Sequence, residues 1–326
     1  MNTNSRTFSK KNTIINIGDY YNRHNLYKTT KTAFSKIKTN ECLNPIHMTN
    51  NRNIEYIFGN NHLILKNRIG SNSRYGIVYL TISKESSNYK FATKLTPAII
   101  ENHNEIIIAS KLSNITIKDM SPHFLIIYKT MICNNKKQLS TMLPNLIKYN
   151  NYLISVNELA SGNFKNFLND AINPLLILNA LQQILIAILS FHYFTGGYFH
   201  NDCHYKNFLF HKINPGGYFH YNIYGKDIYI KNMGYIWMIW DFGLVKKRDV
   251  KRRLEDYFRI LYFFNKYYGD QLGIIGNVYR LKIDYFSVYQ NSDKKFFQSL
   301  FNIANLFQYT IPENSKIINN KPYIIK

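Results

Sequence analysis

Two short polar segments constrain this chain more than any other part of it. Residues 200–207 read His-Asn-Asp-Cys-His-Tyr-Lys-Asn, and residues 240–243 read Trp-Asp-Phe-Gly. The first supplies a carboxylate, Asp202, and an amide, Asn207, from one tight loop, and the second supplies another carboxylate, Asp241. Each follows an apolar stretch of the kind that predicts a strand. Oxygen ligands of this type suit a hard cation such as Mg²⁺, so we expect the fold to bring the two loops together.

The order and spacing of these residues resemble the catalytic loop and the metal-binding loop of the protein kinase superfamily. The resemblance spans about residues 62–265. It implies transfer of the γ-phosphate of ATP, a reaction that depends on positioning and on cations at the phosphate oxygens. It also implies that Asp202 orients the attacking hydroxyl, while Asn207 and Asp241 hold Mg²⁺. In the family, the histidine at the position of His200 bonds backbone near the metal loop, so we expect it to be structural.

A region that resembles the nucleotide-binding part of the family precedes these loops. Lys94, in Phe-Ala-Thr-Lys, is similar to the strand lysine that contacts the α- and β-phosphates. Glu105 is expected to pair with it, with Glu101 as the alternative, and the gap of 11 positions from Lys94 to Glu105 is shorter than the family norm. The segment 69–78 resembles the glycine-rich loop but keeps two glycines where the family has three, so we expect altered phosphate contacts. The residues expected to contact nucleotide there are Ile69, Gly70, Ser71, Asn72, Ser73, Gly76 and Val78.

The segment 158–162, Glu-Leu-Ala-Ser-Gly, resembles the hinge between the two lobes of a kinase, where backbone groups read adenine. The resemblance therefore implies that Glu158 and Ala160 contact the nucleotide. It also places Asn157 at the gatekeeper position, where a polar residue is unusual for the family.

The chain departs from protein kinases near the predicted catalytic residues. Asn201 replaces the arginine that usually reads a phosphate on the activation loop, so this route to activation is expected to be closed. His204 stands where Ser/Thr kinases carry lysine, which is more similar to aminoglycoside and choline phosphotransferases, and Lys206 is a candidate for the missing charge. Only 15 positions separate Asp241 from Asp256, the aspartate expected to anchor the catalytic loop, and no Ala-Pro-Glu motif intervenes. We therefore expect a reduced peptide-docking platform.

An insertion separates the two loops. Its tyrosine-rich stretches 218–223 and 227–230 predict a β-hairpin that ends in the Trp-Met-Ile-Trp at 237–240. This hairpin, together with His-Asn-Asp at 200–202, resembles the protein kinases of large DNA viruses. The abundance of Asn, Ile, Lys, Tyr and Phe agrees with an A+T-rich genome.

These observations predict an α+β chain with a bilobal protein-kinase-like fold, in which a small antiparallel β-sheet lobe sits on a larger, mainly helical lobe. We expect a basic, poorly ordered extension over residues 1–55, which could hold short helices. The N-lobe is expected over about 56–157 and the C-lobe over about 158–326. The expected strands are 62–66, 76–82, 89–94, 124–133 and 152–159, and the expected helices are 101–112, 163–169, 174–193 and 254–268.

Charge and cysteine content bear on partners and compartment. The net charge of +22 favours an anionic partner such as nucleotide, acidic protein, nucleic acid or anionic membrane, with A+T-driven composition as the alternative cause. Cys42, Cys133 and Cys203 show no metal-binding spacing, so we expect a reducing, intracellular compartment. The polar N-terminus predicts no signal peptide. The apolar stretch 175–194 is interrupted by polar residues, which predicts a buried helix and no transmembrane segment.

Three functions remain open at this point. We expect an ATP- and Mg²⁺-dependent serine/threonine protein kinase with an unknown protein substrate, acting in the cytoplasm of a host cell or in a virion. The first alternative is a small-molecule kinase of the aminoglycoside or choline type, favoured by His204 and by the short segment after Asp241. The second is a pseudokinase that serves as a binding module for an acidic partner or nucleic acid, favoured by the incomplete glycine-rich loop.

Overall fold

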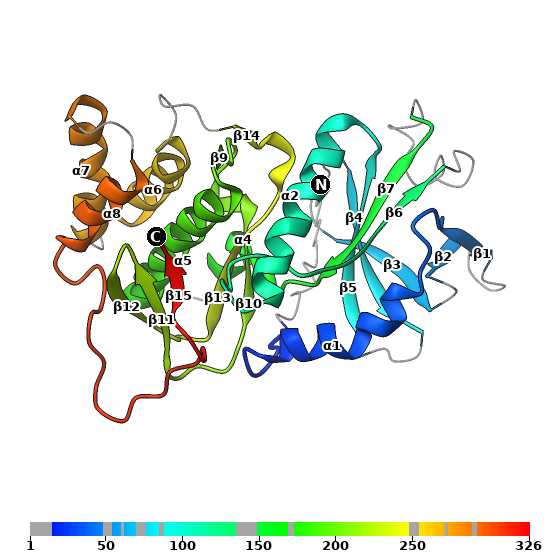
Figure 1. The fold of residues 1–326 in the computed structure, drawn as a ribbon, viewed down its shortest axis with the longest axis horizontal. Coiled ribbons are helices and arrows are strands. Elements are labelled where there is room, and N and C mark those ends of the chain that lie inside the picture. Colours follow the sequence, from blue (N-terminus) through cyan, green and yellow to red (C-terminus); the bar gives the residue numbers. More distant parts are fainter. Residues whose placement is uncertain are drawn as a thin grey trace, which may run out of the picture.

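The fold is mixed α+β, with a large sheet in one half of the molecule and most of the helices in the other (Figure 1). The structure is a computed structural model, and it describes residues 15–47, 54–59, 62–69, 76–84, 88–134, 149–168, 173–247, 254–270, 273–288 and 292–326. The α+β class agrees with the sequence-based prediction.

The large sheet contains the five strands that the sequence predicted and two more. Its strands are β1 (Asn44–His47), β2 (Ile54–Phe58), β3 (Leu63–Ile69), β4 (Ile77–Ser83), β5 (Lys90–Pro97), β6 (Ile127–Cys133) and β7 (Tyr152–Glu158). They lie in the order β1-β2-β3-β4-β5-β7-β6, and every neighbouring pair is antiparallel. The two added strands, β1 and β2, form one edge of the sheet.

This sheet has its own hydrophobic core. Phe91 and Leu95 point inward from β5, and β7, which lies between β5 and β6, is buried at every position. Helix α2 (Ile100–Ile117) packs against β6 and β7; it begins one residue before the predicted helix 101–112 and ends five residues after it. A strand with this much apolar burial is held mainly by the area it removes from water.

Part of the segment expected to be a loose extension is folded. Helix α1 (Asn22–Ser35) buries Arg23, His24, Thr30 and Phe34. The Phe34 ring meets the rings of Phe91 and Tyr128 at centroid distances of 5.2 Å. The structure therefore differs from the sequence-based expectation over α1 and β1, because α1 covers apolar side chains of the sheet. Residues 1–14 and 48–53 lie outside the described residues.

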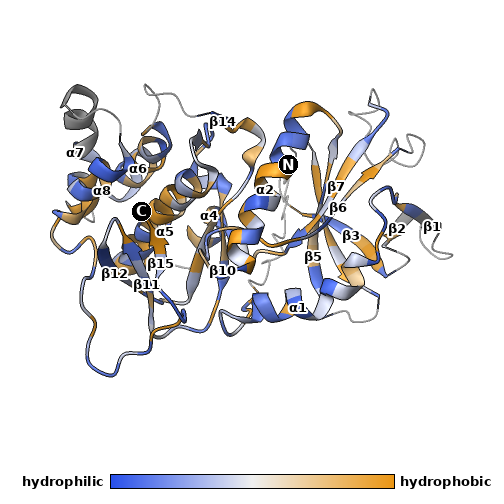
Figure 2. Cartoon of the chain, in the orientation of Figure 1, coloured by the Kyte–Doolittle hydropathy of each residue, from blue (hydrophilic) through white to orange (hydrophobic). Residues whose placement is uncertain are grey.

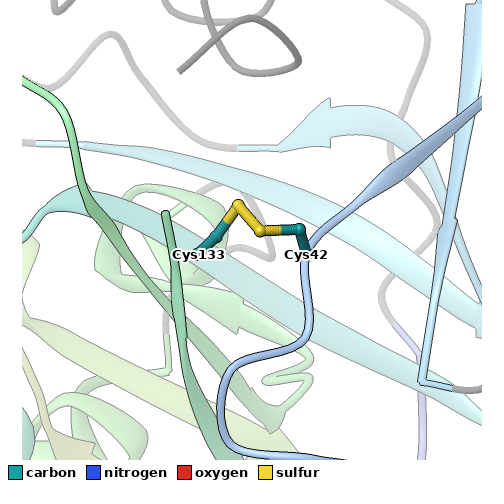
Figure 3. Close-up of a disulfide and its surroundings, with 2 residues drawn as sticks. All are labelled: Cys42 and Cys133. Carbon is teal, nitrogen blue, oxygen red and sulfur yellow. A yellow bond between two sulfur atoms is a disulfide. The ribbon is translucent and has the colours of Figure 1, made fainter. Parts of the chain in front are cut away.

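A disulfide ties the N-terminal region to the sheet. Cys42, two residues before β1, is bonded to Cys133 at the end of β6, across 91 positions of sequence (Figure 3). Cys203 is a free, buried thiol. The sequence analysis did not foresee this pair, because its two cysteines come together only when β1 and β6 are in place. The reducing compartment remains a prediction.

The helices of the other half are α4 (Phe164–Leu168), α5 (Pro174–Thr195), α6 (Glu255–Tyr268), α7 (Gly273–Val288) and α8 (Asp293–Phe301). The α5 helix begins where Asn173 Oδ1 accepts the N–H of Leu175, with Pro174 at the first helical position, and it ends at Gly196 in the left-handed conformation. These are strong start and stop signals. Figure 2 shows α5 as mostly hydrophobic. By length and apolar composition α5 could cross a membrane, but 72% of its most apolar stretch is buried in the fold.

Short strands complete this half. They are β8 (Gly162–Asn163), β9 (Tyr198–Phe199), β10 (Phe208–Lys212), β11 (Tyr218–Ile223), β12 (Lys226–Lys231), β13 (Tyr235–Ile239), β14 (Lys246–Lys247) and β15 (Tyr323–Ile325). The predicted hairpin is confirmed, since β11 pairs antiparallel with β12, and β15 joins β11 in parallel. Two single turns, η2 (Tyr205–Asn207) and η3 (Phe242–Leu244), lie in the two polar segments that constrained the sequence. The helical half and its short strands share a second core, to which α2 contributes Ala109 and Leu112.

Candidate active site

The predicted pair of Lys94 and Glu105 is present. The Nζ atom of Lys94, in the middle of β5, lies 2.5 Å from Oε1 of Glu105 on α2. Both side chains are largely shielded from solvent, with exposures of 11% and 7%. Burial on its own lowers the pKa of Lys94, but the carboxylates of Glu105 and Asp241 outweigh it and raise that pKa above its usual value. Lys94 is therefore protonated at neutral pH, and its ammonium group is held beside Glu105.

Asp241 also contacts Lys94. Its Oδ1 is 3.5 Å from Lys94 Nζ, and its side chain is half exposed. Its backbone has φ +67°, the left-handed region that non-glycine residues seldom adopt and that often occurs at functional sites. The next glycine, Gly243, sits against α2, where an added Cβ would lie 3.6 Å from Glu105 Oε2. The Asp-Phe-Gly segment and α2 thus hold each other in place.

The catalytic-loop residues meet as the spacing predicted. Asn207 Nδ2 donates to the backbone oxygen of Asp202 at 2.8 Å and to Oδ2 of the same residue at 3.0 Å. Because the amide nitrogen is used in this way, the amide oxygen is the remaining ligand atom of Asn207. The Asp202 carboxylate is partly exposed to solvent.

Trp240 joins the two loops through its backbone. Its N–H donates to the backbone oxygen of Asn207 at 3.0 Å, and its carbonyl accepts from His200 Nε2 at 2.9 Å. His200 is fully buried, and burial lowers its pKa. The expectation that His200 bonds backbone beside the metal loop is confirmed. Asn207 and Asp241 are therefore fixed relative to each other by hydrogen bonds on either side of one residue.

Asp256 anchors the catalytic loop from below, as predicted. Its carboxylate, at the start of α6, accepts the backbone N–H groups of His200 at 2.6 Å and Asn201 at 3.0 Å. It also contacts His192 Nε2 at 2.9 Å, and His192 Nδ1 contacts Asp293 on α8 at 3.0 Å. Both ring nitrogens of His192 face a carboxylate oxygen, which requires a proton on each. A chain of buried charges thus runs from α8 to the catalytic loop.

Sequence reasoning missed Arg259, which reaches the catalytic loop from α6. Its Nη1 donates to the backbone oxygen of Asn201 at 2.9 Å and lies 3.8 Å from Asp202 Oδ1, while Nη2 bonds Glu255 at 3.0 Å. The available signal was the acid–base pair at positions i and i+4 on the predicted helix. On the other side of Asp202, His204 Nε2 lies 3.4 Å from Oδ2. The N–H of Lys206 donates to His204 Nδ1 at 3.2 Å, which leaves the ring proton on Nε2.

At the predicted hinge, the Glu158 side chain is engaged by the N-terminal helix. Arg23 donates from Nε to Oε1 at 2.9 Å and from Nη2 to Oε2 at 2.7 Å. His211 Nε2 lies 2.8 Å from Oε1. Burial raises the pKa of Glu158, but Arg23 and His211 outweigh it and hold that pKa well below its usual range. Any nucleotide contact by Glu158 is therefore left to its backbone.

The other predicted nucleotide-binding residues are placed in part. Val78 on β4 is paired with Lys94 on β5, and Gly76 precedes β4 where an added Cβ would come within 2.6 Å of the backbone of Leu95. Asn157 is buried and donates to the backbone of Ala92 and Ser155. Ile69 ends β3, and Ala160 is half-buried just after β7. Gly70, Ser71, Asn72 and Ser73 lie outside the described residues.

The oxygen atoms of Asn207 and Asp241 fit Mg²⁺ by their chemistry, because this ion is held in proteins by one or two carboxylates together with phosphate and water. Within the described ranges, no cluster of three or more His, Cys, Asp or Glu side chains could hold a metal by itself. A site of this kind needs the phosphates of a bound nucleotide to complete it.

No protein-family model matches the chain, and a search of curated proteins finds no match either. The function is therefore inferred from the residues and their geometry.

Proposed function

We propose that this chain is a Mg²⁺- and ATP-dependent phosphotransferase with a bilobal, protein-kinase-like architecture. One observation carries the proposal: Lys94, paired with Glu105, faces Asp241, and Asp241 is tied through Trp240 to the Asp202–Asn207 pair. These residues come from β5, α2 and two separate loops. The presence of two hydrophobic cores, one for the sheet and one for the helices, supports the division into two lobes.

Each residue has a distinct part in the proposed reaction. Lys94 binds the phosphates, and Glu105 keeps its ammonium directed toward them. Asn207 and Asp241 would hold Mg²⁺, which neutralises charge on the phosphate oxygens. Asp202 accepts a hydrogen bond from the acceptor hydroxyl and aims its oxygen at the γ-phosphate. The hydrogen bonds from His200 and Asn201 to Asp256 keep the loop that carries Asp202 in one conformation.

We propose a serine or threonine hydroxyl of a protein as the acceptor, with an intracellular or virion setting. A small alcohol is the second candidate, because η3 and β14 are followed by only a short segment before α6, which leaves little chain for a peptide platform. His204 beside Asp202 favours the same candidate.

The assignment can be tested with variants at two positions. Asp202→Ala should reduce phosphoryl transfer by about 10²- to 10⁴-fold and leave the Mg²⁺-dependent thermal shift with ATP unchanged. Lys94→Met should abolish that shift, whereas Lys90→Met, an exposed position on the same strand, should not. Transfer is measured with radiolabelled ATP and mixed protein or small alcohols as acceptors. Wild-type turnover by Asp202→Ala would refute the assignment.

A further inference from the structure

Four exposed cations lie on the loop that carries Asp202 and on the two elements that adjoin this loop, β14 and α6. They are Lys206, Lys246, Lys247 and Arg259, and together they are called the basic rim. Lysine and arginine side chains carry a positive charge at neutral pH. Charges gathered around one exposed carboxylate set the potential that an incoming substrate meets.

The fold keeps the basic rim close to Asp202. Arg259 Nη1 is 3.8 Å from Asp202 Oδ1, and Lys206 belongs to the same loop. Lys246 and Lys247 form β14, which pairs with β9 immediately before the catalytic loop, Lys246 opposite Phe199. Asp202 follows Phe199 by three positions, so the Cα atoms of Lys246 and Asp202 are at most about 16 Å apart. An extended peptide covers that distance in about five residues.

The described acidic groups near this surface are already engaged. Asp241 faces Lys94, Asp256 is fully buried beneath the loop, and Glu255 bonds Arg259. They therefore offset little of the charge that the three lysines present.

We propose that the acceptor substrate is a protein segment with acidic residues, about two to five positions from a serine or threonine, that bind the basic rim. This inference rests on the proposed function and names its substrate class. The carboxylates of the segment lie against Lys206, Lys246 and Lys247 while its hydroxyl reaches Asp202. The transferred phosphate makes the product more acidic, so a phosphorylated neighbour in the substrate also suits the rim.

Exposed ion pairs are individually weak, so replacing one lysine of the basic rim should change KM only modestly. The free energy of a typical exposed pair corresponds to at most about a 5-fold change in KM. Two lysines removed together should raise KM for an acidic peptide by about 5-fold or more. The effect should shrink as salt rises, because exposed charges are screened.

The experiment compares peptides with a central serine flanked by three glutamates, three glutamines or three lysines on each side. The wild-type chain should phosphorylate the glutamate peptide with the lowest KM. Lys246→Gln/Lys247→Gln should raise KM for that peptide by about 5-fold or more, with kcat and the KM for ATP retained. The control is Lys226→Gln/Lys231→Gln, which removes the same charge from β12, far from β14 in Figure 1. This control should leave KM at the wild-type value.

Several outcomes would overturn the inference while leaving the proposed function intact. They are phosphorylation of the three peptides with equal KM, an equal rise in KM for the β12 control, or transfer to small alcohols only. Inhibition by poly-uridylate, with no preference for the glutamate peptide, would instead assign the basic rim to nucleic acid. Failure of the proposed function itself looks different, since neither a Mg²⁺-dependent shift with ATP nor transfer to any acceptor would be seen.

Discussion

Replacement of Arg23 by leucine should destabilise the protein more than the same replacement of an exposed arginine. The Arg23 guanidinium is buried, donates twice to Glu158, and also donates to the backbone oxygens of Pro122 and Phe124 at 2.7 Å each. Without it, the partners left to the buried Glu158 carboxylate among the described residues are the N–H of Ile126 and His211. Loss of one partner from a buried ion pair costs about 3–5 kcal/mol, a large share of the total stability of a typical domain.

Urea unfolding at pH 7 measures this loss. Arg259→Leu is the matched control, since Arg259 is an exposed arginine paired with Glu255, and it should cost about 1 kcal/mol or less. In the double variant Arg23→Leu/Glu158→Gln, no buried charge is stranded, so most of the stability should return. The coupling free energy from the double-mutant cycle should be several-fold larger than that of the exposed pair.

The pH dependence provides an independent check. The folded-state pKa of Glu158 is depressed, so its contribution is fully present above the unfolded-state pKa and is lost as pH falls. The gap in unfolding free energy between wild type and Arg23→Leu should therefore stay constant from pH 7 to about pH 5 and narrow as pH falls below the unfolded-state pKa of about 4.5. A loss equal to that of Arg259→Leu, or a gap that does not change with pH, would refute the reasoning.

Two further predictions concern other parts of the fold. The disulfide between Cys42 and Cys133 closes a loop of 91 positions, so reduction with dithiothreitol should lower the unfolding free energy by up to about 4.6 kcal/mol. The same reagent should leave Cys42→Ser unchanged, and an equal effect on both proteins would rule out the bond. The second concerns His192. Burial lowers the pKa of this histidine, but its carboxylate partners outweigh burial and raise that pKa above its usual value. The stability that protonated His192 contributes is complete below its unfolded-state pKa and is lost as pH rises through its folded-state pKa. The difference in unfolding free energy between wild type and His192→Gln should therefore narrow from pH 6 to pH 9. A constant difference would show that His192 is not protonated in the folded protein.

Local patterns predicted the parts of the site that lie on regular elements or in one loop. The family resemblance predicted the pairing of Lys94 with Glu105, and it placed Asp202 and Asn207 in one tight loop, where the two side chains are in contact. Residues joined only by the tertiary fold were out of reach. Arg23 lies 135 positions before Glu158, and no periodicity in the sequence connects a basic residue of a polar segment with a strand end so far away.

The same reason explains the misjudged N-terminal region. Its composition is rich in Asn, Lys and Thr, which is typical of a segment that cannot bury enough apolar surface to stay folded by itself. In the structure, α1 does not need a core of its own, because Phe34 shares that of the large sheet. The composition of a segment indicates whether that segment can stay folded by itself. Helix α1 is instead stabilised by residues that follow much later in the chain.

The bond between Cys42 and Cys133 encloses β1 to β6, and with them Lys94 and Glu105, in one covalent ring. Peptide cleavage at a single site between the two cysteines opens this ring without releasing either fragment. Under non-reducing electrophoresis such a nicked chain would still migrate as one species, and it would separate into two only after reduction. The proposed phosphate-binding half could therefore lose a peptide bond and keep all its parts attached.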